Sequence, residues 1–282
     1  MLVRKVIELR KVDKERVVCY HVYIMKILFI GDVVGQYACE KLYAFLPSFK
    51  HELEIGKGLV IVNGENSADG NGITPHSAKL LFKAGADVIT TGNHCFKRHD
   101  MDSTYRENPF ILRPANYGGD APGKGICIID RGSFSAAVIN LAGTNFMIPA
   151  DNPYKCADEL LLSIGIKNII VDFHAEATAE KKAMGYYLSG RVSAVLGTHT
   201  HVQTADEQII DKHTAYITDV GMTGVHDSVL GIDKSVIIER FLCYYPKKHA
   251  LATGKHSINA VLLEIDEKTG KALTISRVNK EI

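Results

Sequence analysis

Short runs of β-branched and other apolar residues recur along this chain, and each run ends in a polar or glycine-containing turn. Residues 26–30, 59–62 and 87–90 show this pattern, and segments with helical spacing of apolar residues follow the first two runs. Strands that alternate with helices are typical of α/β folds, because a parallel strand needs a crossover before the next one can pair with it. The sequence therefore predicts an α/β fold.

Local signals predict further elements along the chain. Thr74 followed by Pro75 is typical of a helix start, since Thr caps free N–H groups and Pro suits the first helical position. Residues 126–130 and 136–141 predict an antiparallel hairpin. We expect further strands at residues 168–171, 192–196, 215–218, 260–265 and 273–278, and helices at about 37–53, 74–83, 154–164 and 178–189.

The chain length of 282 residues suits one large α/β domain. The first strand pattern begins just after Met25, so residues 1–24 are expected to be an N-terminal extension, either appended or read from an upstream start. Residues 25–282 are expected to form a single domain. Residues 225–256 carry no strong strand signal and are predicted to be a cap-like insertion that borders the site.

Composition narrows the class of protein. The 33 Lys and Arg residues nearly balance the 32 Asp and Glu residues, which argues against strong binding of duplex nucleic acid. The six cysteines are scattered without a CxxC pair, as in proteins with reduced thiols. No apolar run approaches the roughly 18 to 20 residues of a membrane span, and charged residues interrupt any secretory pattern near the N-terminus. We therefore expect a cytoplasmic protein with no membrane contact.

Residues that ligate metals follow five of the predicted strands. Carboxyl ends of strands in an α/β sheet form a ligand-binding edge, so these residues can converge on one crevice. Their oxygen and nitrogen donors, without thiolates, favour iron, manganese, zinc or nickel over calcium or copper(I). One ion does not need so many ligands, which predicts two metal ions with Glu65 as the natural bridge. The candidates are Asp32, Glu65, Asn66, Asn93, His94, His174, His199 and His201.

The alternative interpretation is structural. A single Asp or Asn after a strand is usually a turn residue, and a single His is more often structural than a ligand. Turn chemistry gives no reason, however, for His174, His199 and His201 to recur at strand ends. The joint pattern therefore favours a metal site.

Six motifs follow one another along the chain, namely Gly31-Asp-Val-Val-Gly35, Val62-Asn-Gly-Glu-Asn-Ser67, Thr91-Gly-Asn-His94, Asp172-Phe-His-Ala-Glu-Ala-Thr178, Gly197-Thr-His-Thr-His-Val-Gln-Thr204 and Thr218-Asp-Val-Gly-Met-Thr-Gly224. By these motifs the chain resembles the YmdB-like family of calcineurin-type metallophosphoesterases from about Met25 to its C-terminus. One departure from the wider superfamily is that its Asp-x-His opening is Asp32-Val-Val34 here, and its bridging Asp is Glu65.

The resemblance implies a four-layer α/β/β/α sandwich with a dinuclear site and phosphodiesterase activity on 2′,3′-cyclic nucleotides. His94 matches the family's proton donor. By position, the first ion would be held by Asp32, Glu65, Asn66 and His201, and the second by Glu65, Asn93, His174 and His199.

The expected reaction is in-line attack on phosphorus by a hydroxide held by the metals, with His94 as general acid. We expect two divalent or mixed-valence transition-metal ions, iron first, with manganese or zinc as alternatives. The expected partner is a small phosphodiester, and assembly into a homo-oligomer stays open. A broader phosphomonoesterase or nucleotidase would need a cationic pocket, for which Lys97, Arg98 and Arg113 are candidates. A regulatory, RNA-associated protein with a weakly active metal site is the other alternative.

Overall fold

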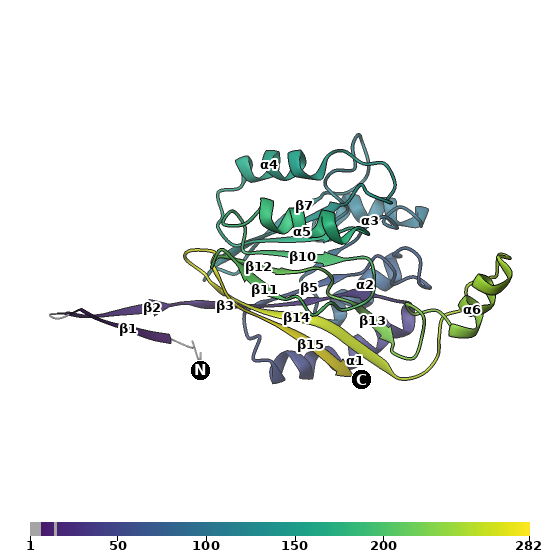
Figure 1. The fold of residues 1–282 in the computed structure, drawn as a ribbon, viewed down its shortest axis with the longest axis horizontal. Helices are drawn as coiled ribbons and strands as arrows, with labels where there is room; N and C mark the ends of the chain where they lie inside the picture. Colours follow the sequence, from purple (N-terminus) through teal and green to yellow (C-terminus); the bar gives the residue numbers. More distant parts are fainter. Residues whose placement is uncertain (1–6, 14–15) are drawn as a thin grey trace.

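Two β-sheets pack face to face in the computed structural model, which describes residues 7–13 and 16–282 (Figure 1). The first sheet has the strand order β4-β13-β14-β3-β5-β6, with β15 beside β14. Its strands β3, β5 and β6 run parallel. The strands are β3 (Ile24–Ile30), β4 (Asp32–Val33), β5 (Leu59–Asn63), β6 (Val88–Thr90), β13 (Met222–Val225), β14 (His256–Asp266) and β15 (Ala272–Glu281).

The second sheet has the strand order β11-β12-β10-β9-β8-β7. Strands β8, β9, β10 and β12 are parallel, whereas β7 and β11 pair antiparallel at the two edges. The strands are β7 (Ile126–Asp130), β8 (Ser135–Ala142), β9 (Ile169–His174), β10 (Ala194–Thr198), β11 (Gln208–Ile210) and β12 (Thr214–Ile217).

Helices cover the outer face of each sheet. Leu28 and Val60 of the first sheet share a buried cluster with residues of α1 (Gln36–Glu52) and α2 (Pro75–Ala84). On the other side of the molecule, the second sheet packs against α4 (Pro153–Ser163) and α5 (Thr178–Tyr187). A third apolar cluster lies between the sheets, because alternate side chains of a strand point to opposite faces. The predicted four-layer α/β/β/α sandwich is confirmed.

The predicted helix start at Thr74 and the predicted hairpin are both confirmed. The N–H of Ser77 donates to Oγ1 of Thr74 at the start of α2. Strands β7 and β8 form the predicted antiparallel hairpin. The short strands β4, β11 and β13 were not expected, since two to four residues carry too little periodic signal. Strand β9 runs to His174, beyond its predicted end at residue 171.

Two segments lie outside the sandwich. In the predicted N-terminal extension, β1 (Ile7–Asp13) and β2 (Arg16–Val22) form an antiparallel hairpin that extends away from the sheets (Figure 1). The rest of this extension lies partly outside the described residues. Within the predicted cap, α6 (Lys234–Cys243) has no buried residue and projects from the opposite side of the molecule (Figure 1). The division into extension, domain and cap stays a prediction.

Two short helical elements lie between strands of the two sheets. A 3₁₀ turn (His99–Met101) and the short helix α3 (Asp102–Glu107) follow the loop after β6. Within the described part of the chain, no helix is long and apolar enough to cross a membrane. The five cysteines whose side chains are described are free thiols, as their scattered positions predicted.

Candidate metal centre

The predicted ligands converge at one end of both sheets. The first sheet supplies the carboxylate and amide residues, which follow β3, β5 and β6, and the second sheet supplies three histidines at the ends of β9 and β10. The prediction of convergence assumed a single open sheet, in which ligands bind at the carboxyl ends of the strands. In this structure the ligands converge because two sheets pack against each other. Asp32 lies in the short strand β4 rather than in a turn, and pairs with Met222 of β13.

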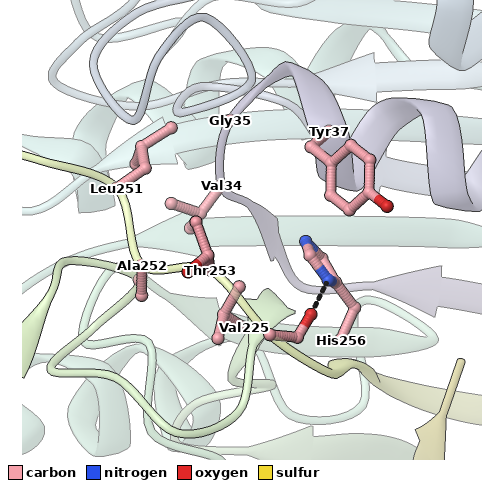
Figure 2. Close-up of a pocket in the computed structure, with 10 residues that line it drawn as sticks. Val34, Gly35, Tyr37, Val225, Leu251, Ala252, Thr253 and His256 are labelled. Atoms are coloured by element: carbon pink, nitrogen blue, oxygen red, sulfur yellow. Dashed lines mark hydrogen bonds between the residues drawn. The ribbon is translucent and has the colours of Figure 1, made fainter.

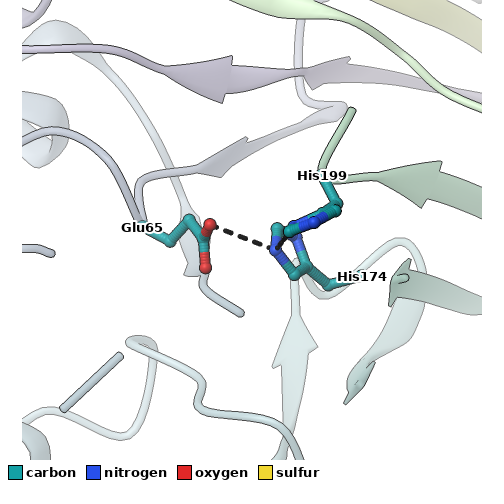
Figure 3. A group of neighbouring side chains, drawn as sticks. All are labelled: Glu65, His174 and His199. Atoms are coloured by element: carbon teal, nitrogen blue, oxygen red, sulfur yellow. Dashed lines mark hydrogen bonds and ion pairs between the residues drawn. The ribbon is translucent and has the colours of Figure 1, made fainter. Parts of the chain in front are cut away.

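Three groups surround Nε2 of the buried His174. Oε1 of Glu65 lies 3.1 Å away, Nδ1 of His199 lies 3.0 Å away, and Oδ1 of Asn93 lies 3.0 Å away. Glu65, His174 and His199 each offer a donor atom within 4.8 Å of the others, and Figure 3 shows the three side chains turned toward one another. Such a group can hold a metal ion.

A second group adjoins the first through Glu65. The Asn66 amide nitrogen donates to Oε1 of Glu65 at 3.2 Å and lies 3.0 Å from Nε2 of His201. Oδ1 of Asp32 lies 3.9 Å from the same His201 nitrogen. The Asn66 amide presents its oxygen to His94 at 2.8 Å. As a ligand Asn66 would have to turn its amide over, since only the oxygen has a lone pair to donate.

Hydrogen bonds on the outer side fix which nitrogen of each histidine faces the cluster. Nδ1 of His174 donates to Oγ1 of Thr198, which in turn donates to Asp172. Nδ1 of His201 lies 3.2 Å from the carbonyl oxygen of Leu230, which can only accept. Protons on these outer nitrogens leave lone pairs on the inner ones. This is the usual arrangement around histidines that ligate a metal.

The electrostatics of the site also fit a bound cation. Burial alone would raise the pKa of Glu65, but the neighbouring His174 and His94 outweigh it and hold that pKa well below its usual range. Burial likewise opposes protonation of His174, yet Glu65 and Asp32 raise its pKa. Within the described chain, the buried Oδ1 of Asp32 has no hydrogen-bond partner. These carboxylates therefore favour a positive charge nearby, which a transition-metal ion bound by oxygen and imidazole would supply.

His94 lies at the margin of the cluster. Its backbone N–H donates to Oε2 of Glu65 at 3.2 Å, and its Nδ1 donates to the Asn66 oxygen. The side chain is 29% exposed, whereas that of His174 is fully buried. Burial lowers the pKa of His94 from its usual value. With Nδ1 engaged, Nε2 is the atom through which His94 can exchange a proton with a bound molecule.

A buried ion pair supports the loop that carries His199 and His201. It joins Lys181 to Asp219, neither of which was among the predicted site residues. Both histidines have positive φ, at 107° and 64°, which non-glycine residues rarely adopt. The Asp219 carboxylate accepts from the backbone N–H of Thr200 at 2.9 Å and from Lys181 at 2.7 Å. Asp219 directly follows the predicted strand at residues 215–218, and that position is the signal that could have identified it.

Gly92 gives a first test of this packing. A Cβ atom at this position would lie inside van der Waals contact of both His174 and Glu65. Gly92→Ala is therefore expected to displace two ligands, to destabilise the fold by about 1–3 kcal/mol, and to lower activity by about 10²-fold. Metal content, thermal unfolding and turnover would be measured together. Gly165→Ala is the control, since nothing lies within 4 Å of a Cβ there, and equal behaviour of the two variants would contradict the prediction.

The candidate cationic residues differ in their contacts. Arg98 donates to the carbonyl oxygens of Asn71 and Ala68, and Arg113 donates to that of Pro114. Both guanidinium groups thus hold backbone segments in place. Lys97 is exposed and near enough to His94 to lower its pKa.

A separate cavity of about 440 Å³ lies at the start of α1, beyond Val34 (Figure 2). Its walls are mostly apolar, and Tyr37 and His256 meet there edge to face with ring centres 5.0 Å apart. None of the predicted metal ligands lines it. The candidate metal centre is therefore distinct from this cavity.

Comparisons with known proteins agree on one family. The family model described as "YmdB-like protein" matches residues 28–278. A Bacillus subtilis (strain 168) protein named 2′,3′-cyclic-nucleotide 2′-phosphodiesterase is 45% identical over 256 residues, which cover 90% of this chain and 96% of that protein. A crystal structure titled as a novel phosphatase from Mycoplasma pneumoniae is 32% identical with a TM-score of 0.86, covering 92% and 94% of the two chains. A hypothetical protein from Thermus thermophilus is 38% identical with a TM-score of 0.85, covering 91% and 99%.

Proposed function

The chain belongs to the YmdB-like family, and from this we propose that it is a metal-dependent phosphodiesterase that hydrolyses 2′,3′-cyclic nucleotides or related small phosphodiesters. Hydrolysis of phosphate esters follows from the names of its relatives together with the cluster of Glu65, His174 and His199. The cyclic nucleotide as substrate comes from the Bacillus subtilis relative, which matches over nearly its whole length.

One contact carries the proposal that the centre holds two ions. Oε1 of Glu65 lies 3.1 Å from Nε2 of His174 on one side and 3.2 Å from the Asn66 amide on the other. A carboxylate that adjoins both groups of ligands in this way supports the bridging role. The first ion would be held by Asp32, Glu65, Asn66 and His201, and the second by Glu65, Asn93, His174 and His199. When bound, two such ions lower the pKa of a water molecule and withdraw charge from phosphoryl oxygens.

His94 supplies the proton in this proposal. A water molecule that has already lost one proton to solvent forms the bond to phosphorus while the bond from phosphorus to the 2′-oxygen breaks, and Nε2 of His94 gives its proton to that departing oxygen. The cyclic diester opens to a 3′-monoester. When Asn66 ligates through its oxygen, its amide nitrogen would donate to Nδ1 of His94, so that the ring proton lies on Nε2 and is available to the departing oxygen. Such general acid help contributes typically about 10²- to 10⁴-fold.

Iron is the first expectation for the metal, with manganese or zinc as alternatives. The first set of ligands contains one imidazole and three oxygen donors, and oxygen-rich sites accept iron and manganese. Metal analysis of anaerobically purified protein tests this point. Two equivalents of iron would support iron as the metal, and two equivalents of zinc with full activity would replace iron by the zinc alternative.

The contacts of the arginines favour a diester over a monoester. A dianionic monoester needs free cations, but Arg98 and Arg113 donate to backbone carbonyl oxygens, which leaves Lys97 as the exposed one of the three candidates. The deciding experiment compares kcat/KM of one metal-loaded preparation on a 2′,3′-cyclic nucleotide and on the matching 3′-monoester. We expect the cyclic diester to be the better substrate. A higher value on the monoester would instead assign the chain as a phosphatase or nucleotidase.

A further inference from the structure

We propose that Glu176, to which neither motif nor relative assigns a task, is a positioning residue that holds His199 in the orientation needed to ligate a metal ion. This inference rests on the metal centre proposed above. Oε2 of Glu176 lies 3.0 Å from Nε2 of His199. The other ring nitrogen of His199, Nδ1, faces the cluster at 3.0 Å from His174.

The fold brings the two residues together. Strands β9 and β10 are parallel neighbours, and Thr198 pairs with His174 in their register. Glu176 lies two residues beyond His174, and His199 lies one residue beyond Thr198. The residues just past the two strand ends are therefore adjacent in space. Glu176 also lies two residues before the first residue of α5, where the positive end of the helix dipole favours a carboxylate.

This contact decides which lone pair of His199 is available. A carboxylate only accepts hydrogen bonds, so the proton of the neutral imidazole resides on Nε2 and leaves Nδ1 free to bind a cation. Thr198 and Leu230 do the same for His174 and His201. Glu176 thus completes a set in which each of the three histidines has an acceptor behind it.

Glu176 differs from those two acceptors because it carries charge and is accessible. Its side chain is 48% exposed, while that of His199 is 20% exposed. The His199 ring is thus partly open to water, and without Glu176 its Nε2–H would bond to water instead. The ring could then rotate and present the protonated nitrogen to the cluster. A carboxylate behind a metal-bound imidazole also raises its basicity, and loss of such a partner typically costs about 10- to 100-fold in metal affinity.

The test is metal affinity, measured by competition with a chromophoric chelator and without substrate. We expect Glu176→Ala to weaken binding of Mn²⁺ by about 10- to 100-fold. Glu176→Gln should recover most of the loss, since its amide oxygen can still accept the proton of Nε2. Glu159→Ala removes a charge from the exposed face of α4 and should bind Mn²⁺ as the wild type does.

Several results would overturn the inference. Wild-type Mn²⁺ affinity in the Glu176→Ala variant would exclude a positioning role. An equal loss in the Gln and Ala variants would point to direct ligation by the carboxylate instead. Unfolding in excess chelator should be the same for wild type and variants, and a large drop there would show a merely structural role. Because no substrate is present, loss of this inference would leave the phosphodiesterase proposal intact, and absence of hydrolysis would leave the affinity result intact.

Discussion

Glu65→Gln is expected to abolish most of the activity, because the variant should not hold two metal ions. The Glu65 carboxylate is 1% exposed and lies between the His174 group and the Asn66 group. A Gln side chain has nearly the same shape but carries no charge. It would leave two ions facing each other with one negative charge fewer between them, in a buried site where charges are weakly screened. Both metal occupancies should fall.

The measurement is metal content per chain after gel filtration, with turnover on a 2′,3′-cyclic nucleotide from the same sample. Glu159→Gln is the matched control, since it makes the same chemical change on an exposed helix face. Thermal unfolding in chelator would verify that the Glu65 variant is folded. If it retained two full equivalents of metal, the bridging role would be wrong.

His94→Ala should have the opposite signature, with metal retained and turnover reduced by about 10²- to 10⁴-fold. His94 contacts the cluster through a backbone N–H and through the Asn66 amide, but its ring is the most exposed of the site histidines. Removing the ring therefore takes away the proton donor and leaves the other donors in place. Metal analysis and steady-state kinetics on one preparation would separate the two effects.

The leaving group provides the sharper version of this test. An aryl leaving group departs without a proton, so an aryl phosphodiester should lose far less rate in His94→Ala than a cyclic nucleotide does. His99→Ala serves as control, because His99 is exposed a few residues along the same loop. Equal losses on both substrates, or wild-type rates on the cyclic nucleotide, would refute the role of His94 as acid.

The residue patterns predicted the strands and helices of an α/β fold and the residues that meet at the site, for a physical reason, whereas the four layers followed from the family resemblance. Buried parallel strands such as β5 are continuous apolar runs, and each polar residue at the end of such a run stands out against it. Thr74 and Pro75 mark the start of α2 by capping chemistry alone. Signals of this kind are local and need no knowledge of the partner strand.

The remaining features depend on contacts between distant segments. Lys181 looks like one more helical lysine in the sequence, yet it is buried against Asp219, which holds the Thr200 backbone. Glu176 contacts His199 only because β9 and β10 pair, which the sequence does not reveal. The β4–β13 pairing has two residues on one side, too few for a periodic pattern. Tertiary packing therefore creates these features.

Because the ligands are divided between two sheets, the apolar layer between the sheets sets the distance between the two groups of ligands. Phe29 and Ile61 of one sheet pack in the same cluster as Val138 and Leu196 of the other, and their volumes set how far apart the oxygen donors and the imidazoles stand. Shortening one of these side chains would let the sheets shift, and so retune the affinity for the ions from a distance. A bound ion, in turn, would link the two sheets and stabilise their packing by an amount that grows with the logarithm of its affinity.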